Sequence, residues 1–208
     1  FAVDVIDPFP AGVTQIENTV TLPGGDPGNP DPEASDDTPV TAAPDITAVK
    51  SSALIDSNSN GLAEPGEILE YTIVITNSGN QSAADLVFTD IPDANTTLVV
   101  GSVSPPIVIT GNTIGDTSVE IHIASLAGEG GTCTVTFRVT INDPLPVDVT
   151  DVYNTGFVGG DGVEVITNET DDPVTTTLDL SVAKTDHDAT GIPSGTVTYD
   201  ITVTNDGD

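Results

Sequence analysis

The stretch LEYTIVITN, residues 69–77, indicates the fold class of this chain. Every second residue from Leu69 to Ile75 is large and apolar, and most of the residues between them are polar. A period of two, in a run rich in β-branched residues, is typical of a strand with one buried face. Comparable patterns recur at 45–50, 84–90, 97–103, 106–110, 117–124, 132–142 and 149–158. Roughly seven or eight short strands without a helical period predict an antiparallel, immunoglobulin-like β-sandwich.

The sequence also contains an internal repeat. Three pairs of segments align: FAVDVIDPFPAGVTQIENT (1–19) with FRVTINDPLPVDVTDVYNT (137–155), DDTPVTAAPDITAVK (36–50) with TDDPVTTTLDLSVAK (170–184), and YTIVITNSGN (71–80) with YDITVTNDGD (199–208). One unit therefore spans about 135 residues, which is long enough to bury a core of its own. The fold class predicted is all-β, with immunoglobulin-like sandwiches in tandem.

The repeat divides the chain into five parts. We expect the last strands of a preceding unit (1–22), an acidic Pro/Gly-rich linker (23–44), a complete sandwich (45–168), a short acidic linker (169–178) and the first two strands of a following unit (179–208). Neither end part can close a sandwich alone. Two interpretations remain open: a window on a longer array, or a subunit whose ends complete neighbouring subunits by strand donation.

The motifs of the full unit resemble a known family. A first strand ending in Lys is followed by PGEILEYTIVITNSGN, then FTDIPD, then TCTVTFRVTI after a Gly-rich turn, then YNTG. This order resembles a tandem immunoglobulin-like repeat domain of unknown function found in extracellular surface proteins of bacteria and archaea. The resemblance implies a sandwich in long arrays at the cell surface, and it does not imply an enzyme.

The charge of the chain restricts its partners. Asp and Glu number 33 against three Lys and Arg, a formal net charge of −30. Such a chain repels nucleic acid and anionic membranes, and its charge indicates divalent cations, high salt, or both. No run of apolar residues is long enough to predict a membrane span. Disorder is disfavoured, because 37% of the residues are apolar and they recur with a strand period.

The stretch DSNSNGLAEPGE, residues 56–67, fits the calcium-loop template D-x-[DN]-x-[DN]-G-x5-E. The candidate metal ligands are Asp56, Asn58, Asn60, the carbonyl of Leu62, Glu64 through a water molecule, and Glu67. Pro65 and Gly66 oppose a following helix, so this would be the loop without its usual helices. The alternative interpretation is a solvated turn rich in Asn, Ser and Gly.

The repeat alignment places this loop in an insertion that the following copy lacks, since TDHDATGIPSG (185–195) does not have the ligand spacing. The loop joins the first two strands of the unit, so we expect it at the pole that faces the next unit. Ca2+ bound there would stiffen the joint. Two neutral Asn ligands predict weak binding, on the order of 10⁻⁵ to 10⁻³ M.

Two of the three basic residues, Lys50 and Lys184, occupy the same repeat position. Lys50 has the phase of the buried face of its strand, as Asp90 and Asn154 have on theirs, so the three side chains are expected to meet in the core. An unpaired ammonium would be costly there. The constellation resembles the intramolecular Lys–Asn isopeptide cross-links of bacterial surface domains, with the acid assisting. The alternative is a hydrogen-bonded Lys–Asp pair with Asn nearby.

These features predict a structural module of an extracellular filament, stalk or sheath, stiffened by calcium. Its partners would be neighbouring repeats or identical subunits in a polymer. The alternative is an adhesin or a carbohydrate-binding surface module, although aromatic residues make up only 4% of the chain. No Ser/His/Asp or Cys/His grouping supports an enzyme.

Overall fold

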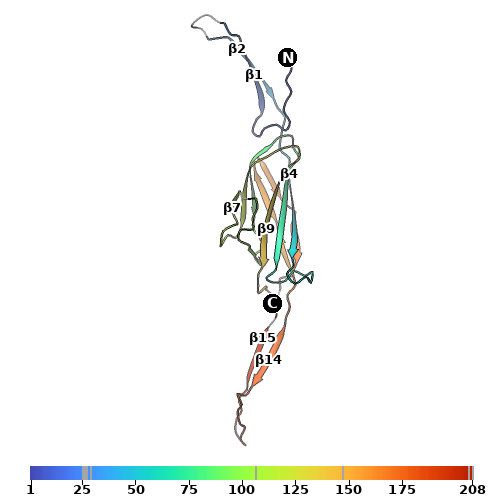
Figure 1. Cartoon of the computed structure of the whole chain (residues 1–208), viewed down its shortest axis with the longest axis vertical. Helices are drawn as coiled ribbons and strands as arrows, with labels where there is room; N and C mark the ends of the chain where they lie inside the picture. Colours follow the sequence, from blue (N-terminus) through green and yellow to red (C-terminus); the bar gives the residue numbers. More distant parts are fainter. Residues whose placement is uncertain (25–27, 29, 106, 147, 206, 208) are drawn as a thin grey trace.

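The computed structural model describes residues 1–208 except 25–27, 29, 106, 147, 206 and 208. The molecule is elongated, with a sandwich between two hairpins (Figure 1). One hairpin consists of β1 (Gln15–Thr21) and β2 (Glu33–Pro39), and the other of β14 (Leu180–Thr185) and β15 (Asp200–Asn205). The regular elements of the described residues are all strands, which confirms the all-β class. None of these residues forms a helix that could cross a membrane.

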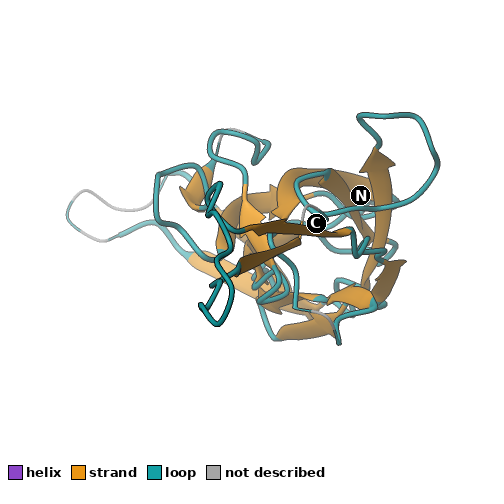
Figure 2. Cartoon of the chain, turned by 90° about the horizontal axis from the view of Figure 1, so that it is seen from below, coloured by secondary structure: helices purple, strands orange, loops and turns teal. Residues whose placement is uncertain are grey.

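Two antiparallel sheets form the sandwich. One sheet has the order β3-β4-β9-β6, and its strands are β3 (Ile46–Ile55), β4 (Ile68–Asn77), β9 (Gly131–Ile141) and β6 (Thr96–Leu98). The other has the order β12-β11-β5-β8-β7, and its strands are β12 (Val163–Ile166), β11 (Gly156–Gly160), β5 (Ala83–Asp90), β8 (Val119–Leu126) and β7 (Val108–Thr110). A separate pair joins β10 (Asp151–Asn154) to β13 (Thr170–Pro173). Viewed from below, along the long axis, the strands surround a common interior (Figure 2).

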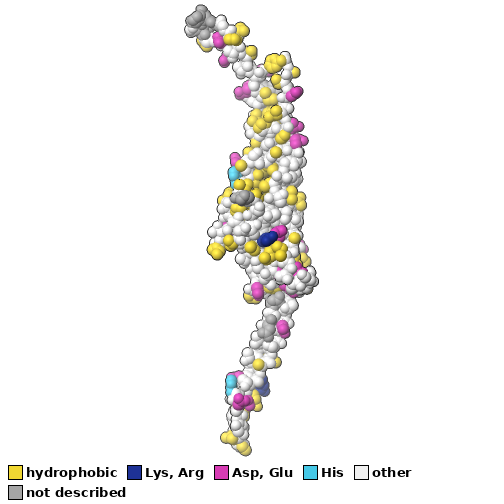
Figure 3. Space-filling model, viewed as in Figure 1, with side chains coloured by type: hydrophobic (Ala, Val, Ile, Leu, Met, Phe, Trp, Pro, Cys, Tyr) yellow, Lys and Arg dark blue, Asp and Glu magenta, His cyan; other side chains and the backbone are white. Residues whose placement is uncertain are grey.

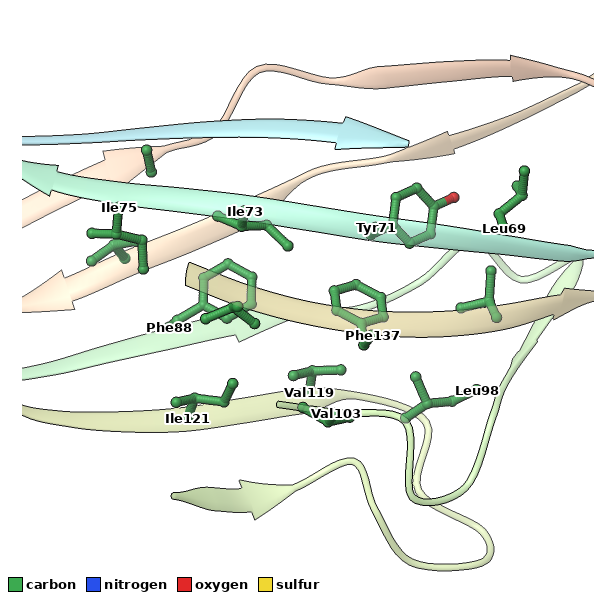
Figure 4. Packing of buried hydrophobic residues seen from close by; sticks show 14 of the residues in the cluster. Leu69, Tyr71, Ile73, Ile75, Phe88, Leu98, Val103, Val119, Ile121 and Phe137 are labelled. Atoms are coloured by element: carbon green, nitrogen blue, oxygen red, sulfur yellow. The ribbon is translucent and has the colours of Figure 1, made fainter. Parts of the chain in front are cut away.

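The core lies between the two sheets and is built by the alternation seen in the sequence. Leu69, Tyr71, Ile73 and Ile75 of β4 are buried, and they face Phe88, Val119 and Ile121 of the other sheet (Figure 4). On the neighbouring strand the ring of Phe137 lies 5.2 Å from that of Tyr71, centroid to centroid. Full burial of one such large side chain contributes about 1.5–3 kcal/mol. This double layer of apolar faces holds the sandwich together.

The C-terminal half of the unit differs from the predicted strand pattern. The segment expected as one strand at 149–158 is two strands, β10 and β11, which belong to different sheets. The chain changes sheets before Gly156, where a Cβ would come within 2.6 Å of the Phe88 ring, so only glycine allows this approach. The strands β12 and β13 follow, and each has only four residues, which is too short a run for a clear strand period in the sequence.

The end hairpins reproduce parts of the sandwich in register. In β1–β2 Asn18 pairs with Asp36, as Asn154 pairs with Thr170 in β10–β13. In β14–β15 Lys184 pairs with Ile201, and the equivalent residue Lys50 pairs with Ile73 in β3–β4. These shared registers follow the same alignment as the sequence repeat.

Both expected linkers contain a strand. Strand β2 lies within residues 23–44, and β13 lies within residues 169–178. Strand β13 pairs with β10, and the next residue, Val174, is buried. The sandwich therefore extends to Val174, beyond the expected boundary at residue 168. Acidic, largely exposed strands such as β13 pair through their backbones, so hydrophobicity does not mark them in the sequence.

Candidate functional site

The loop from Asp56 to Glu67 connects β3 to β4 and is organised around Asp56. The carboxylate of Asp56 accepts hydrogen bonds from the backbone N–H groups of Gly61 at 2.7 Å, Ser59 at 2.6 Å and Asn58 at 3.1 Å. These donors, Gly61 first, lower the pKa of Asp56. Ser59 and Gly61 take the left-handed conformation, with φ of 63° and 80°, which closes the sharp turn. Asp56 therefore stays ionised at the first ligand position.

Asn58 and Asn60, the next two candidate ligands, fix the turns of the loop through their side-chain oxygens. The side-chain oxygen of Asn58 accepts the N–H of Asn60 at 3.0 Å, and that of Asn60 accepts the N–H of Leu62 at 2.8 Å. Each amide oxygen is thus tied to the backbone two residues further on, as in an Asx turn. The result is an ordered loop in which alternate residues carry oxygen atoms.

The two glutamates close the loop. Glu67 is buried, and its Oε1 accepts bonds from the N–H of Ser57 at 2.8 Å and from its hydroxyl at 2.9 Å. Glu64 Oε2 accepts a bond from the side chain of Asn58 at 2.6 Å. Among the described residues, no three Asp, Glu, His or Cys side chains already form a group that could hold a metal ion. Binding would require Glu64 and Glu67 to turn from these partners toward the ion.

The loop lies against the segment that leads to β14. Ala63 is buried and forms a parallel bridge with Val174, and its carbonyl accepts the N–H of Thr175 at 2.8 Å. At the opposite pole, Phe9 is buried and its N–H donates to the carbonyl of Asn80 at 2.9 Å. The sandwich is thus joined to the parts before and after it by backbone hydrogen bonds at its two poles (Figure 1).

A second site lies in the core. Lys50 Nζ lies 2.5 Å from Asp90 Oδ2, and both residues are only 2% exposed. The ammonium lies 4.7 Å from the centre of the Tyr71 ring and 5.3 Å from that of Phe137. Burial is the largest influence on both groups: it lowers the pKa of Lys50 and raises the pKa of Asp90, while each partner's charge opposes the change. Burial therefore brings the two pKa values closer together, which makes transfer of the proton from Lys50 to Asp90 easier than it is in water.

Asn154 completes the predicted group of three. It is 3% exposed, and neither its amide oxygen nor its amide nitrogen makes a hydrogen bond of ordinary geometry. It lies close enough to Asp90 to lower the pKa of that acid as a side-chain donor. Gly156, two residues on, pairs with Asp90, and this register brings β10 alongside the end of β5. The three residues come from β3, β5 and β10.

Two further residues of the cluster were not predicted. The side chain of Asn168 makes two hydrogen bonds to the backbone of Lys50, accepting its N–H at 2.9 Å and donating to its carbonyl at 2.8 Å. Asp172 Oδ1 accepts the hydroxyl of Ser52 at 2.5 Å, and its Oδ2 is buried without a partner. In the sequence Asn168 stands out only as the start of an N-x-T sequon, and Asp172 only as one of an acidic pair.

The equivalent positions of the end hairpins carry the same residue types in open surroundings. Lys184 lies 4.1 Å from the centre of the Tyr199 ring, as Lys50 lies over Tyr71. Both Lys184 and Asn18 are exposed. The lysine-over-tyrosine arrangement thus belongs to the first two strands of a unit, and the complete sandwich adds burial and the acid.

Comparison with known proteins gives similarities to solved structures alone. No family model matches the chain, and no curated protein sequence matches it. A major pilin subunit of Bacillus cereus, BcpA, matches with a TM-score of 0.47 and 11% identity over 94% of this chain and 70% of that one. The major pilin SpaD of Corynebacterium diphtheriae matches with a TM-score of 0.44 and 13% identity over 77% of this chain and 49% of that one. The C-terminal domain of the BspA polypeptide of Streptococcus agalactiae matches with a TM-score of 0.38 and 16% identity over 73% of this chain and 60% of that one.

Proposed function

We propose that this chain is a structural module of an extracellular filament, stalk or sheath, in which sandwich units follow one another along one axis. The proposal rests on two sets of backbone hydrogen bonds, one at each pole, which join the sandwich to the parts of the chain before and after it. Residues that correspond to the end of one unit are hydrogen-bonded to the sandwich at 80–82, and the segment that leads to the next unit is hydrogen-bonded at Ala63. Such in-line joints suit a load-carrying array better than they suit a catalyst or a receptor.

Calcium at residues 56–67 is the second part of the proposal. The ordered loop meets the template spacing and touches the chain that leads to the next unit. An ion there would fix the loop against this segment and would offset part of the net charge of −30. The expected weak binding, on the order of 10⁻⁵ to 10⁻³ M, would suit calcium concentrations outside the cell.

Neighbouring repeats are the partners that we favour. The exposed hairpin β14–β15 corresponds to β3–β4, and completing it requires counterparts of β5 and β8. By the repeat alignment, residues 1–44 correspond to segments from β9 to the start of β3, so a second copy of this part supplies neither counterpart. Residues 1–44 of one copy and 179–208 of another would therefore leave the second sheet of a composite unit largely unfilled.

Calcium titration followed by thermal unfolding tests the metal site. An ion present at about ten times its Kd stabilises the folded protein by about 1.4 kcal/mol, which raises the Tm by a few degrees. Glu67→Gln should abolish this rise. The matched control is Asp188→Asn, which removes an acid from 185–195 and should leave the rise unchanged. Equal Tm values with calcium and with chelator would contradict the calcium part.

Electron micrographs of the native material, with calcium and with chelator, test the filament part. We expect linear assemblies in both conditions, straighter with calcium. Discrete globular particles in both conditions would overturn the structural role, whatever the calcium titration shows.

A further inference from the structure

We propose that Lys50 and Asn154 become joined by an amide bond between Nζ and Cγ, formed by the folded protein itself with Asp90 as the proton acceptor and donor. The inference rests on the buried cluster and is independent of the proposed function. It assigns a reaction to residues that would otherwise be three polar groups in an apolar core.

The first observation is that this cluster is poorly explained as a structural ion pair. A buried amide usually forms hydrogen bonds through both its oxygen and its nitrogen, and burying it without partners costs about 1–3 kcal/mol. Asn154 has no ordinary partner on either atom, and Asp90 Oδ1 has none. A bond from Asn154 Cγ to Lys50 would turn the unpaired amide and the buried charge into one neutral group.

The second observation is that the nucleophile is fixed at both ends. Asn168 bonds to the N–H and the C=O of Lys50, which holds the backbone of β3 beside the segment that follows β12. At the other end the amine lies between Asp90 and the rings of Tyr71 and Phe137. A reacting atom that is held in position in this way gains rate, because little motion remains to be frozen.

The chemistry balances without any added reagent. Lys50 first gives a proton to Asp90, as burial of both groups favours, and the neutral amine attacks Cγ of Asn154 while the protonated acid donates a hydrogen bond to Oδ1. A proton from Nζ then passes through Asp90 to Nδ2, the Cγ–Nδ2 bond breaks, and ammonia leaves. The ammonium, carboxylate and primary amide thus become a secondary amide, a neutral acid and one ammonia molecule, with no oxidation or reduction.

The mass of the intact chain is the first test. The folded wild-type chain should weigh one ammonia molecule less than its sequence, also after denaturation. A full-length mass equal to the sequence would overturn the proposal. A mass deficit alone is not sufficient, because cyclisation of Asn60 before Gly61 also releases ammonia.

Trypsin separates these two sources, because the chain contains only Lys50, Arg138 and Lys184 as cleavage sites. A Lys50 whose amine is acylated is not cleaved. The proposal therefore predicts a branched product in which residues 1–138 are bonded to 139–184. Free peptides 1–50, 51–138 and 139–184, with or without a mass deficit, would contradict it.

Variants assign the roles. Asn154→Ala keeps the Lys50–Asp90 pair, so it should fold, judged by circular dichroism, and it should have neither the deficit nor the branched product. Asp90→Asn should lose both for want of a proton acceptor. Lys184→Met is the matched control and should keep the mass deficit and a branched product, in which 1–138 is now bonded to 139–208 because the cleavage site at 184 is gone. If it lost the deficit and the branch, the bond would involve the other lysine and the assignment to Lys50 would be wrong.

Asn168 is a positioning residue in this proposal, since it touches the backbone of Lys50 and not the reacting atoms. Asn168→Ala should slow the appearance of the branched product by about tenfold or more after synthesis, without preventing it in the end. A merely structural role would lower the Tm and leave the rate of the reaction unchanged, and that result would remove Asn168 from the mechanism.

Discussion

At the scale of single residues, this protein buries polar groups that most sandwiches keep at the surface. Lys50, Asp90 and Asn154 are almost inaccessible, and Asp172 holds one carboxylate oxygen in the interior without a partner. An unpaired buried group of this kind lowers stability, because it loses its hydration and receives nothing in return. Only a few can be tolerated in one core.

Asp172→Asn is therefore expected to stabilise the protein at neutral pH, by about 1 kcal/mol. The amide oxygen can still accept the hydroxyl of Ser52, and the charge is removed. Burial, the largest cause, raises the pKa of Asp172 in the folded state above that of the unfolded chain, so the folded state holds this proton more tightly and stability falls as pH rises through that window.

The advantage of the Asn variant should accordingly disappear below about pH 4, where the wild-type acid is protonated in both states. Thermal unfolding of both proteins across this pH range measures the difference. A difference that did not change with pH would show that the charge of Asp172 is not its cause.

At the scale of the elements, prediction from sequence succeeded where the two faces of a strand differ. β4 and β9 alternate between core and the other face, so their existence and most of their bounds follow from the sequence. β10, β11 and β13 are short, and the change of sheet before Gly156 depends on contacts with β5 that are remote in sequence. Hydrophobic periodicity cannot report such contacts.

The residues of the candidate sites could likewise be predicted only where a sequence pattern marks them. Spacing alone gives the prediction of a calcium loop, because its candidate ligands are neighbours in sequence, and calcium binding there stays a prediction. Phase and repeat position predicted the triad of Lys50, Asp90 and Asn154, because each residue carries a polar group on an apolar face. Asn168 was missed because it acts from a loop through the backbone of another strand, which leaves no periodic signal.

Gly156→Ala tests the pairing of β5 with β11. A methyl group there would meet the Phe88 ring at 2.6 Å and Asp90 Oδ2 at 3.0 Å, so one of these side chains must move. We expect a loss of about 1–3 kcal/mol of stability and a lower yield of the Lys50–Asn154 bond. Gly191→Ala is the control, since its nearest neighbour would be at 3.7 Å, and it should change neither. Wild-type stability of the Gly156 variant in denaturant would contradict this account.

At the scale of the whole molecule, charge opposes the fold. Acidic side chains are spread over the visible face without gathering into one patch (Figure 3). Repulsion between these side chains opposes the compact state, and salt screens it.

Salt should therefore raise the Tm by several degrees between about 0.01 M and 1 M NaCl, as the Debye length falls from about 30 Å to about 3 Å. If Ca2+ binds at 56–67 as proposed, millimolar calcium should produce a further rise that magnesium at equal ionic strength does not reproduce, because Mg2+ is smaller and gives up its water ligands reluctantly. A Tm independent of NaCl would show that repulsion between the 33 acids is not significant in the folded chain.

The position of β13 beside β3 has a mechanical consequence. Asn168 is hydrogen-bonded to Lys50, and Asp172 is hydrogen-bonded to Ser52. The segment that contains β13 therefore runs parallel to β3. In an array of the kind proposed, a pull would enter at the start of β3 and leave at the end of β13, at opposite poles. These contacts are then loaded in shear, where they share the force and do not yield one after another. A covalent link from β3 to β10 would carry that tension past the core, so the hydrophobic sandwich could remain folded while the strand bears the load.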